Sequence, residues 1–270
     1  MEESEAGRRR ALWALGALTL ASLVAGDTVR SLRAPVGTPV ARARTVVRPP
    51  VAEPPAPRAT APRATAPLKA KHQPVQSLRD LAPAAPGNAI ALTIDDGPHP
   101  EWTPKMLDLL AEHEVRATFS VIGVHVQRFP RLAERIVQAG HQLCNHTMHH
   151  PIPFNRLPAK RILTEIVEAQ ERIADATGVA ARFFRSPGGS WSRRVVHTAD
   201  DHDLIPIDWD VDPRDWSRPG TRRIAESMLA CRPGAILLCH DGGGDRSETL
   251  KALRTVIPRL KHRGLTFVSL

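Results

Sequence analysis

Two adjacent carboxylates stand out in the sequence because of where they occur. Asp95 and Asp96 follow the apolar run 89–94 and precede a Gly-Pro pair, which a regular strand does not continue through. Successive side chains of an extended chain point to opposite sides, so one carboxylate can bind a metal ion while the other holds a proton. The same residues also fit an ordinary turn after a strand, and the pair alone does not decide between the two interpretations.

A pair of histidines adds candidate metal ligands. His146 and His150 lie four residues apart, and residues at this spacing share one face of a helical turn, so both rings can reach one ion. With a carboxylate from Asp96 they make a set of two histidines and one carboxylate. Such a set suits Zn²⁺ with an open position for water, and it also suits other divalent ions. We expect His149 to face away from the ion.

The elements that must position these residues are strands that alternate with helices. Strands are expected at 89–94, 118–122, 142–145, 182–185, 204–208, 235–239 and 266–269. Helices are expected at 103–113, 130–139, 159–176, 193–201, 221–231 and 247–263. Seven strands in alternation with helices predict a parallel α/β fold. A closed or nearly closed barrel fits this count, and a doubly wound open sheet is the competing topology.

The polar candidates fall where expected strands end. In chain order they are Asp95, Asp96, His146, His150, Arg185, Asp212, Asp215, Trp216 and His240. The ends of parallel strands in a barrel converge on one face, and that face holds active sites. The sequence therefore predicts one site that is built from distant segments.

The charge of the chain is concentrated before residue 89. Residues 1–88 hold 13 Lys/Arg and 6 Asp/Glu, a net of +7, out of a formal net charge of +9. The remaining residues are nearly neutral, so the charge gives no reason to expect nucleic acid as a partner. A basic N-terminal segment is attracted to anionic surfaces such as lipid head groups.

Two N-terminal segments are expected to precede the folded domain. Three arginines at 8–10 come before the uncharged apolar run 11–26, which is typical of a secretory signal peptide or an uncut membrane anchor. Residues 28–88 are rich in Pro, Ala and Arg, which predicts an extended, disordered linker. We therefore assign a signal peptide or anchor to 1–27, a linker to 28–88 and a domain to 89–270. We expect a secreted or membrane-anchored protein with this domain outside the cytoplasm.

Five segments of the domain resemble, in this order, the polysaccharide deacetylases of the NodB-homology type, carbohydrate esterase family 4. They are TIDDG at 93–97, HTMHH at 146–150, RSPG at 185–188, DPRDW at 212–216 and LCH at 238–240. The resemblance covers essentially all of the expected domain. It implies a distorted (β/α) barrel with seven or eight strands, usually short of full closure.

The resemblance also implies a role for each candidate residue. The implied metal ligands, for Zn²⁺ or another divalent ion such as Co²⁺, are Asp96, His146 and His150. The implied catalytic residues are the general base Asp95, its cationic partner Arg185, the general acid His240 and the orienting carboxylate Asp215. The implied substrate-binding groups are Trp216 and Leu238 around the acetyl methyl, and the backbone N–H of Gly188 at the oxyanion.

Two positions depart from the family pattern. Ile94 replaces an aromatic residue at a core position. Gly188 stands where the third segment often carries an aromatic side chain, so one wall of the sugar groove is missing. We expect Trp191 to replace that wall. The shape of the groove, and so the choice of substrate, depends on this replacement.

Together these observations predict a metal-dependent hydrolase that removes N-acetyl groups from a GlcNAc-containing polysaccharide and releases acetate. Peptidoglycan is expected first, because the linker suggests a cell-wall location, and chitin oligomers are expected second. The alternatives are an O-acetyl esterase that acts on xylan with the same site, a non-catalytic barrel that binds glycans, and a hydrolase of small cyclic amides. The complete set of candidate residues favours an enzyme over a binding module. We expect the protein to act as a monomer.

Overall fold

The computed structural model of the protein describes residues 73–270. The predicted signal peptide or anchor (1–27), and the predicted linker as far as residue 72, lie outside the described residues. Within 73–270, no helix combines the length and the apolar composition that crossing a membrane requires.

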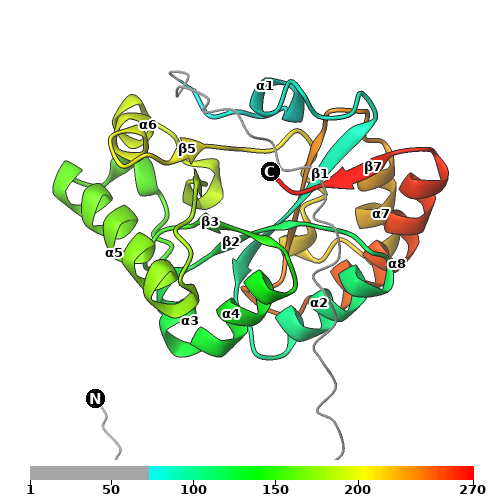
Figure 1. Ribbon diagram of the computed structural model, residues 1–270, viewed down its shortest axis with the longest axis horizontal. Helices are drawn as coiled ribbons and strands as arrows, with labels where there is room; N and C mark the ends of the chain where they lie inside the picture. Colours follow the sequence, from blue (N-terminus) through cyan, green and yellow to red (C-terminus); the bar gives the residue numbers. More distant parts are fainter. Residues whose placement is uncertain (1–72) are drawn as a thin grey trace, which may run out of the picture. The chain divides into compact units, whose positions relative to one another are not determined.

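Seven parallel strands form the centre of this part of the chain (Figure 1). They are β1 (Ala89–Gly97), β2 (Thr118–Val121), β3 (Gln142–Asn145), β4 (Phe183–Phe184), β5 (Ile205–Pro206), β6 (Ile236–His240) and β7 (Thr266–Val268). Their order is β5-β4-β3-β2-β1-β6, and β7 also pairs with β1. All pairings are parallel. The chain proceeds one way from β1 to β5 and then returns to the other side of β1, as it does in a barrel.

Isolated bridges join the two ends of this sheet. The bridging pairs are Val75–Ile207, Ser77–Ala235 and Val211–Leu237. The sheet therefore curls round on itself, although no continuous ladder connects β5 to β6. This arrangement confirms the prediction of a distorted (β/α) barrel with seven strands, and it is not the doubly wound open sheet.

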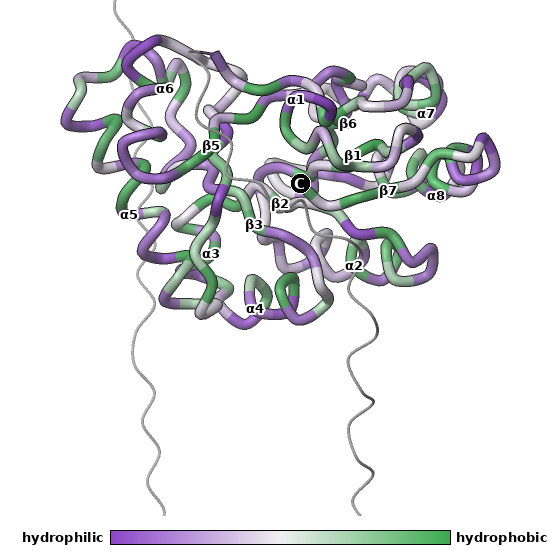
Figure 2. Tube along the Cα trace, turned by 45° about the horizontal axis from the view of Figure 1, so that its top comes forward, coloured by the Kyte–Doolittle hydropathy of each residue, from purple (hydrophilic) through white to green (hydrophobic). Residues whose placement is uncertain are grey.

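Helices surround the curled sheet (Figure 1). They are α1 (Leu78–Leu81), α2 (Trp102–Glu112), α3 (Gly123–Arg128), α4 (Pro130–Gln138), α5 (Ala159–Thr177), α6 (Arg193–Asp200), α7 (Thr221–Leu229) and α8 (Ser247–His262), with short 3₁₀ helices η1 (Phe154–Arg156), η2 (Pro187–Gly189) and η3 (Asp215–Ser217). Hydrophilic and hydrophobic residues alternate along the helices (Figure 2), which suits elements that bury one side only. The expected apolar stripe of α5 is fully buried and comprises Ile162, Ile166, Ala169 and Ile173.

The alternation along β1 explains how the fold aims one carboxylate into the barrel. Ile90, Leu92 and Ile94 pack in the large core cluster that includes residues of α2 and α8. Ala89 and Ala91 belong to a second cluster inside the barrel. Because side chains alternate between the two faces, the next residues of the inward set are 93 and 95. The strand therefore directs its first carboxylate inward at its carboxyl end.

The boundary predicted between linker and domain needs correction. The linker was expected to extend to residue 88, but Val75, Leu78 and Leu81 are buried. Leu78 and Leu81 lie in the short helix α1, which Ser77 caps by accepting a hydrogen bond from the backbone N–H of Arg79 at 3.2 Å. Two prolines shortly after this helix resemble the composition of the linker, although the segment packs against the sheet. The folded part thus begins about a dozen residues before β1.

Candidate active site

The predicted residues converge on one cavity of about 450 Å³ at the carboxyl ends of the strands. Eight of the eleven predicted site residues line it: Asp95, Asp96, His146, His150, Gly188, Trp216, Leu238 and His240. Arg185 and Asp215 lie behind this lining and contact it. Trp191 is not part of the lining.

Asp96, His146 and His150 form a group that could hold a metal ion, with ligand atoms all within 4.8 Å of one another. Asp96 Oδ1 lies 3.5 Å from His146 Nε2 and 3.3 Å from His150 Nε2. This oxygen is buried and has no hydrogen-bond partner among the described residues. A buried, unsatisfied carboxylate oxygen that faces two imidazole nitrogens fits a divalent cation.

The two rings meet through a loop and not through the helical turn that their spacing predicted. Thr147 and His150 both have positive φ, 68° and 55°, as does Asp96 at 73°. His146 Nδ1 donates to the carbonyl of Arg185 at 2.8 Å, which leaves Nε2 to face the carboxylate. His149 faces away, as expected, with Nδ1 3.0 Å from Glu165 Oε1.

The protonation states of these ligands are set by opposing effects. Burial raises the pKa of Asp96, but the charges of the facing imidazoles, His146 first and then His240 and His150, outweigh it and hold that pKa well below its usual range. Burial and the charge of His146 lower the pKa of His150 to about 4, so its ring is neutral. Burial lowers the pKa of His146, yet Asp95 and Asp96 raise it overall. Because a metal ligand must be deprotonated, an ion and a proton compete for this ring.

Asp95 forms a buried ion pair with Arg185. The guanidinium donates from Nη1 to Asp95 Oδ1 and to Thr93 Oγ1, each at 2.8 Å, and from Nη2 to the carbonyl of Asp208 at 2.8 Å. Burial raises the pKa of Asp95, but Arg185 and the nearby histidines lower it overall. The carboxylate therefore remains ionised in a buried position. Because Arg185 contacts Oδ1, Oδ2 is the oxygen that faces the imidazole of His146, at 3.7 Å.

His240 is held and charged by Asp215. Its ring Nδ1 lies 2.7 Å from Asp215 Oδ1, and its backbone N–H donates to Asp215 Oδ2 at 2.9 Å. Thr249 also donates to Oδ2, at 2.8 Å. Burial lowers the pKa of His240, but the hydrogen bond and charge of Asp215 raise it to about 9. The imidazole is thus protonated at neutral pH, with Nε2 directed away from Asp215.

Trp191, which was predicted to form a wall of the groove, does not line the cavity, and a different tryptophan does. The indole of Trp191 donates to Asp208 Oδ2 at 3.2 Å and packs edge-on against Phe184, with ring centroids 5.8 Å apart. Trp209 lines the cavity instead. A side chain at Gly189 would lie 3.0 Å from the Trp209 ring, so the glycine makes room for it. Both tryptophans follow Gly188 in sequence, and only the fold distinguishes them.

Several supporting residues have no signal in the five segments. Glu165 is 1 % exposed and accepts from the N–H of His149 at 2.7 Å, which fixes the loop between the two histidine ligands. A buried acid within the apolar stripe of α5 was the available sequence signal. Thr103 donates to the buried carboxylate of Asp241 at 2.5 Å and so holds the loop after β6. Exposed Ile152 borders the cavity beside Gly188.

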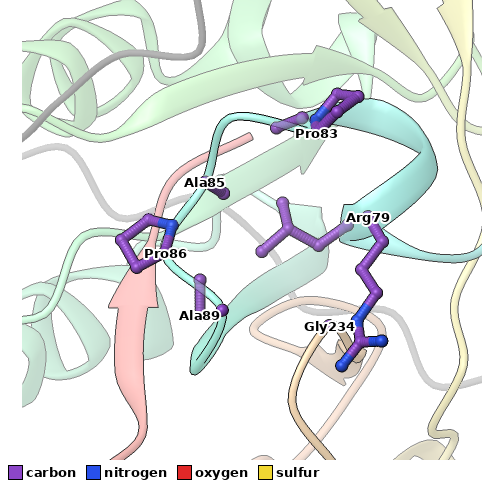
Figure 3. A pocket seen from close by; sticks show the side chains of 9 residues that line it. Arg79, Pro83, Ala85, Pro86, Ala89 and Gly234 are labelled. Atoms are coloured by element: carbon purple, nitrogen blue, oxygen red, sulfur yellow. The ribbon is translucent and has the colours of Figure 1, made fainter.

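A second cavity, of about 260 Å³, lies at the opposite ends of β1 and β6 (Figure 3). Its nine lining residues are Leu78, Arg79, Ala82, Pro83, Ala85, Pro86, Gly87, Ala89 and Gly234. They include no acid, histidine, cysteine or hydroxyl side chain. This cavity therefore lacks groups for acid–base or metal chemistry.

A curled parallel barrel with a possible Asp-His-His metal site, a buried ionised carboxylate and a protonated imidazole fits a metal-dependent hydrolase. The family model for polysaccharide deacetylase matches residues 82–206. A chitooligosaccharide deacetylase from Bradyrhizobium sp. (strain ANU 289) is 43% identical over 189 residues, which cover 65% of this chain and 86% of the relative. The chain therefore belongs to the polysaccharide deacetylase family, carbohydrate esterase family 4.

Solved structures of the family agree with this assignment. A peptidoglycan N-acetylglucosamine deacetylase in complex with an N-hydroxybenzamide compound matches with a TM-score of 0.67 and 33% identity, over 73% of this chain and 90% of that one. A pseudoenzyme of the family from Bacillus anthracis matches with a TM-score of 0.64 and 34% identity, over 68% of this chain and 64% of that one. Because the family also contains pseudoenzymes, the completeness of the site matters for assigning an activity.

Proposed function

We propose that this protein hydrolyses N-acetyl groups of a GlcNAc-containing glycan and releases acetate. The observation that carries the proposal is the convergence, on one cavity, of the Asp-His-His group, the ionised Asp95 and the protonated His240. Each of these groups meets one requirement of amide hydrolysis, and none of them is missing. A non-catalytic glycan-binding barrel has no need to bury such costly charges.

Asp96, His146 and His150 are the residues that would hold the ion, for which we propose Zn²⁺ or another divalent ion such as Co²⁺. Such an ion supplies a Lewis acid that lowers the pKa of water and polarises a carbonyl. The ionised carboxylate and the neutral ring of His150 are the forms that bind metal.

Asp95 is the proposed general base. Its Oδ1 is occupied by Arg185 at 2.8 Å, so Oδ2 is the oxygen available to accept a proton from the attacking water. The same ion pair keeps the carboxylate unprotonated at neutral pH, which a general base requires.

The backbone N–H of Gly188 is the proposed donor to the developing oxyanion. The backbone N–H groups of Gly189 and Ser190 already donate within their own turn, whereas Gly188 lies at the cavity wall.

His240 is the proposed general acid. Asp215 occupies its Nδ1, so the proton for the departing amine comes from Nε2. An amine is a poor leaving group until it is protonated, which makes this step necessary. Trp216 and Leu238 line the same cavity and would enclose the methyl of the acetyl group.

Peptidoglycan is the substrate we place first, and chitin oligomers come second. The relatives named above act on both kinds of glycan by name. The basic, apolar N-terminus and the Pro/Ala-rich segment that follows support a secreted or membrane-anchored enzyme, with its domain outside the cytoplasm, where peptidoglycan is at hand. We propose that it acts as a monomer.

The test is acetate release by the purified full-length protein, stripped of metal and then reloaded with Zn²⁺ or Co²⁺. Purified peptidoglycan, chitin oligomers and acetylated xylan are compared, with Asp95→Asn as the control. Metal-dependent release that the variant loses supports the proposal and ranks the substrates. Release from xylan alone would assign an O-acetyl esterase, and glycan binding without release would assign a binding module.

A further inference from the structure

Arg246 is a buried cation in the active-site cavity that the mechanism above does not use. It directly precedes α8, is 2 % exposed, and lines the cavity beside Gly243. Its Nε donates to the carbonyl of Gly242 at 2.6 Å, and its Nη1 contacts the carbonyl of Asp215 at 3.4 Å. Nη2 has no partner among residues 73–270, and within them the guanidinium makes no ion pair.

The unpartnered nitrogen lies next to Gly243 at the wall of the cavity. A methyl group at Gly243 would lie 3.0 Å from Asp96 Oδ2 and 3.2 Å from Arg246 Nη2. Gly243 has a φ of 72°, which favours glycine. A side chain at this position would crowd both the Asp96 carboxylate and the guanidinium, so glycine leaves Nη2 of Arg246 open to the cavity.

Most other charges of the cavity have partners of opposite sign. Asp95 pairs with Arg185, and Asp215 with His240. The carboxylate of Asp212, which also lines the cavity, accepts from the N–H of Arg214 at 2.7 Å and forms no ion pair with Arg246 among the described residues. A largely buried guanidinium without a counter-charge has lost much of its hydration, so a ligand that neutralises it gains affinity.

The chemistry of the Arg246 guanidinium suits a carboxylate. Guanidinium groups bind carboxylates through short, charge-assisted hydrogen bonds. We propose that Arg246, on the cavity wall beside Gly243, forms a carboxylate-binding site of the active-site cleft. Given the proposed function, two sources can supply the group: the acetate that the reaction releases, or the lactyl carboxylate of a muramic acid residue that carries no peptide. Neutral chitin oligomers offer only the first.

The test compares Arg246→Met and Arg246→Lys with the wild type, all as full-length protein loaded with Zn²⁺. Arg214→Met is the matched control, because it removes an exposed arginine near the cleft that does not line the cavity. Calorimetry measures binding of acetate, with acetamide as the neutral probe. We expect Arg246→Met to weaken acetate roughly tenfold or more and acetamide less than about twofold. The acetate affinity of Arg246→Lys should lie between those of the wild type and Arg246→Met, and the affinity of Arg214→Met should equal that of the wild type.

A second arm identifies the source of the carboxylate. It compares kcat/KM for a chitin oligomer with that for a peptidoglycan fragment whose lactyl group is free or methyl-esterified. If acetate affinity falls and the preference for the free acid is unchanged, the site binds the product. If Arg246→Met loses only that preference, the site binds the glycan.

Unchanged acetate affinity and unchanged preference, in a variant with wild-type metal content and thermal stability, would overturn the proposal. If Arg246→Met does not fold, the same two readouts on Arg246→Lys decide. Acetate calorimetry needs no turnover, so a protein that binds acetate through Arg246 but releases none from any glycan would refute the proposed function and leave this site standing.

Discussion

The neighbouring strands β1 and β6 have a cavity at each end, and the two cavities differ in the residues that line them. At the carboxyl ends, Asp95 stands in register with His240, and the cavity there is lined by acids and imidazoles. At the amino ends, Ala89 and Gly234 border a cavity of alanine, proline and glycine (Figure 3). The strands are the same, so the difference comes from the residues that follow or precede them. One end carries the chemistry, and the other closes the barrel.

The difference also lies in how the two ends are stabilised. The carboxyl end buries charges, and most of them depend on a partner of opposite sign, as Asp95 does on Arg185. The amino end is covered by α1, whose Leu78 and Leu81 are buried among apolar residues. Substitutions at the first end should therefore affect activity, and those at the second should affect stability at most.

Asp95→Asn should have the largest effect. It removes the proposed base and leaves Arg185 buried without its counter-charge, so acetate release should fall by about 10²–10⁴-fold. Acetate assays with metal content measured in parallel check this expectation. A variant that keeps its metal and more than about a tenth of the activity would show that another group accepts the proton.

Gly242→Ala and Gly87→Ala form a matched pair across the two ends. A methyl group at Gly242 would overlap the backbone carbonyl of Asp96, whereas nothing lies within 4 Å of one at Gly87. We expect Gly242→Ala to displace the metal-binding carboxylate, lower the affinity for Zn²⁺ and cost about 1–3 kcal/mol of unfolding free energy. Gly87→Ala should change stability by less than about 1 kcal/mol. Metal titration and thermal unfolding measure the Zn²⁺ affinity and the stability of both variants. Equal effects of the two substitutions would contradict the account.

Asp215→Asn should change the pH dependence of the reaction. His240 acts as an acid only while protonated, so the rate should fall as the pH rises through its pKa of about 9. Without the charge of Asp215 that pKa drops, and the alkaline limb of kcat should move to lower pH. A pH profile of kcat for both proteins tests this shift, and an unmoved limb would remove His240 from its assigned role.

Trp209→Ala should weaken substrate binding more than it changes turnover. Its ring lines the cavity next to Gly189, and we expect KM for glycans to rise by roughly tenfold. Trp191→Phe is the control, because it removes only the hydrogen bond to Asp208 and should leave KM unchanged. If the control raises KM and Trp209→Ala does not, the sequence-based assignment of the groove wall was the better one.

Arg79→Met, at the second cavity, should have the smallest effect. Arg79 is exposed and is the only charged residue in the lining of that cavity. We expect acetate release within twofold of wild type and unfolding free energy within about 0.5 kcal/mol. A large loss of activity would show that the amino end takes part in the reaction.

Much of the fold and the site could be predicted because the relevant signals are local. The apolar run of β1 and the stripe of α5 follow from their periodicity. The placement of Asp95 and Asp96 follows from a strand that ends. Strand ends converge in any parallel barrel, so the grouping of Arg185 and His240 with them required no knowledge of loops.

The remaining features depend on contacts between distant segments. His146 and His150 meet through residues with positive φ, which the spacing alone did not indicate. Trp191 and Trp209 carry the same side chain, and the path of the loops decided which one lines the groove. The helix α1 was obscured by the prolines next to it. The sequence could not predict that Nη2 of Arg246 lacks a partner, because this depends on where Gly243 and Asp96 lie.

A metal titration of acetate release tests the central claim most directly. Full-length protein freed of metal is titrated with Zn²⁺ while acetate release from peptidoglycan is followed, alongside Asp96→Ala. The account predicts that release starts from background, rises linearly and levels off at one ion per chain, and that the variant shows no such rise. Equal release by the metal-free protein, or an unaltered titration of Asp96→Ala, would contradict it.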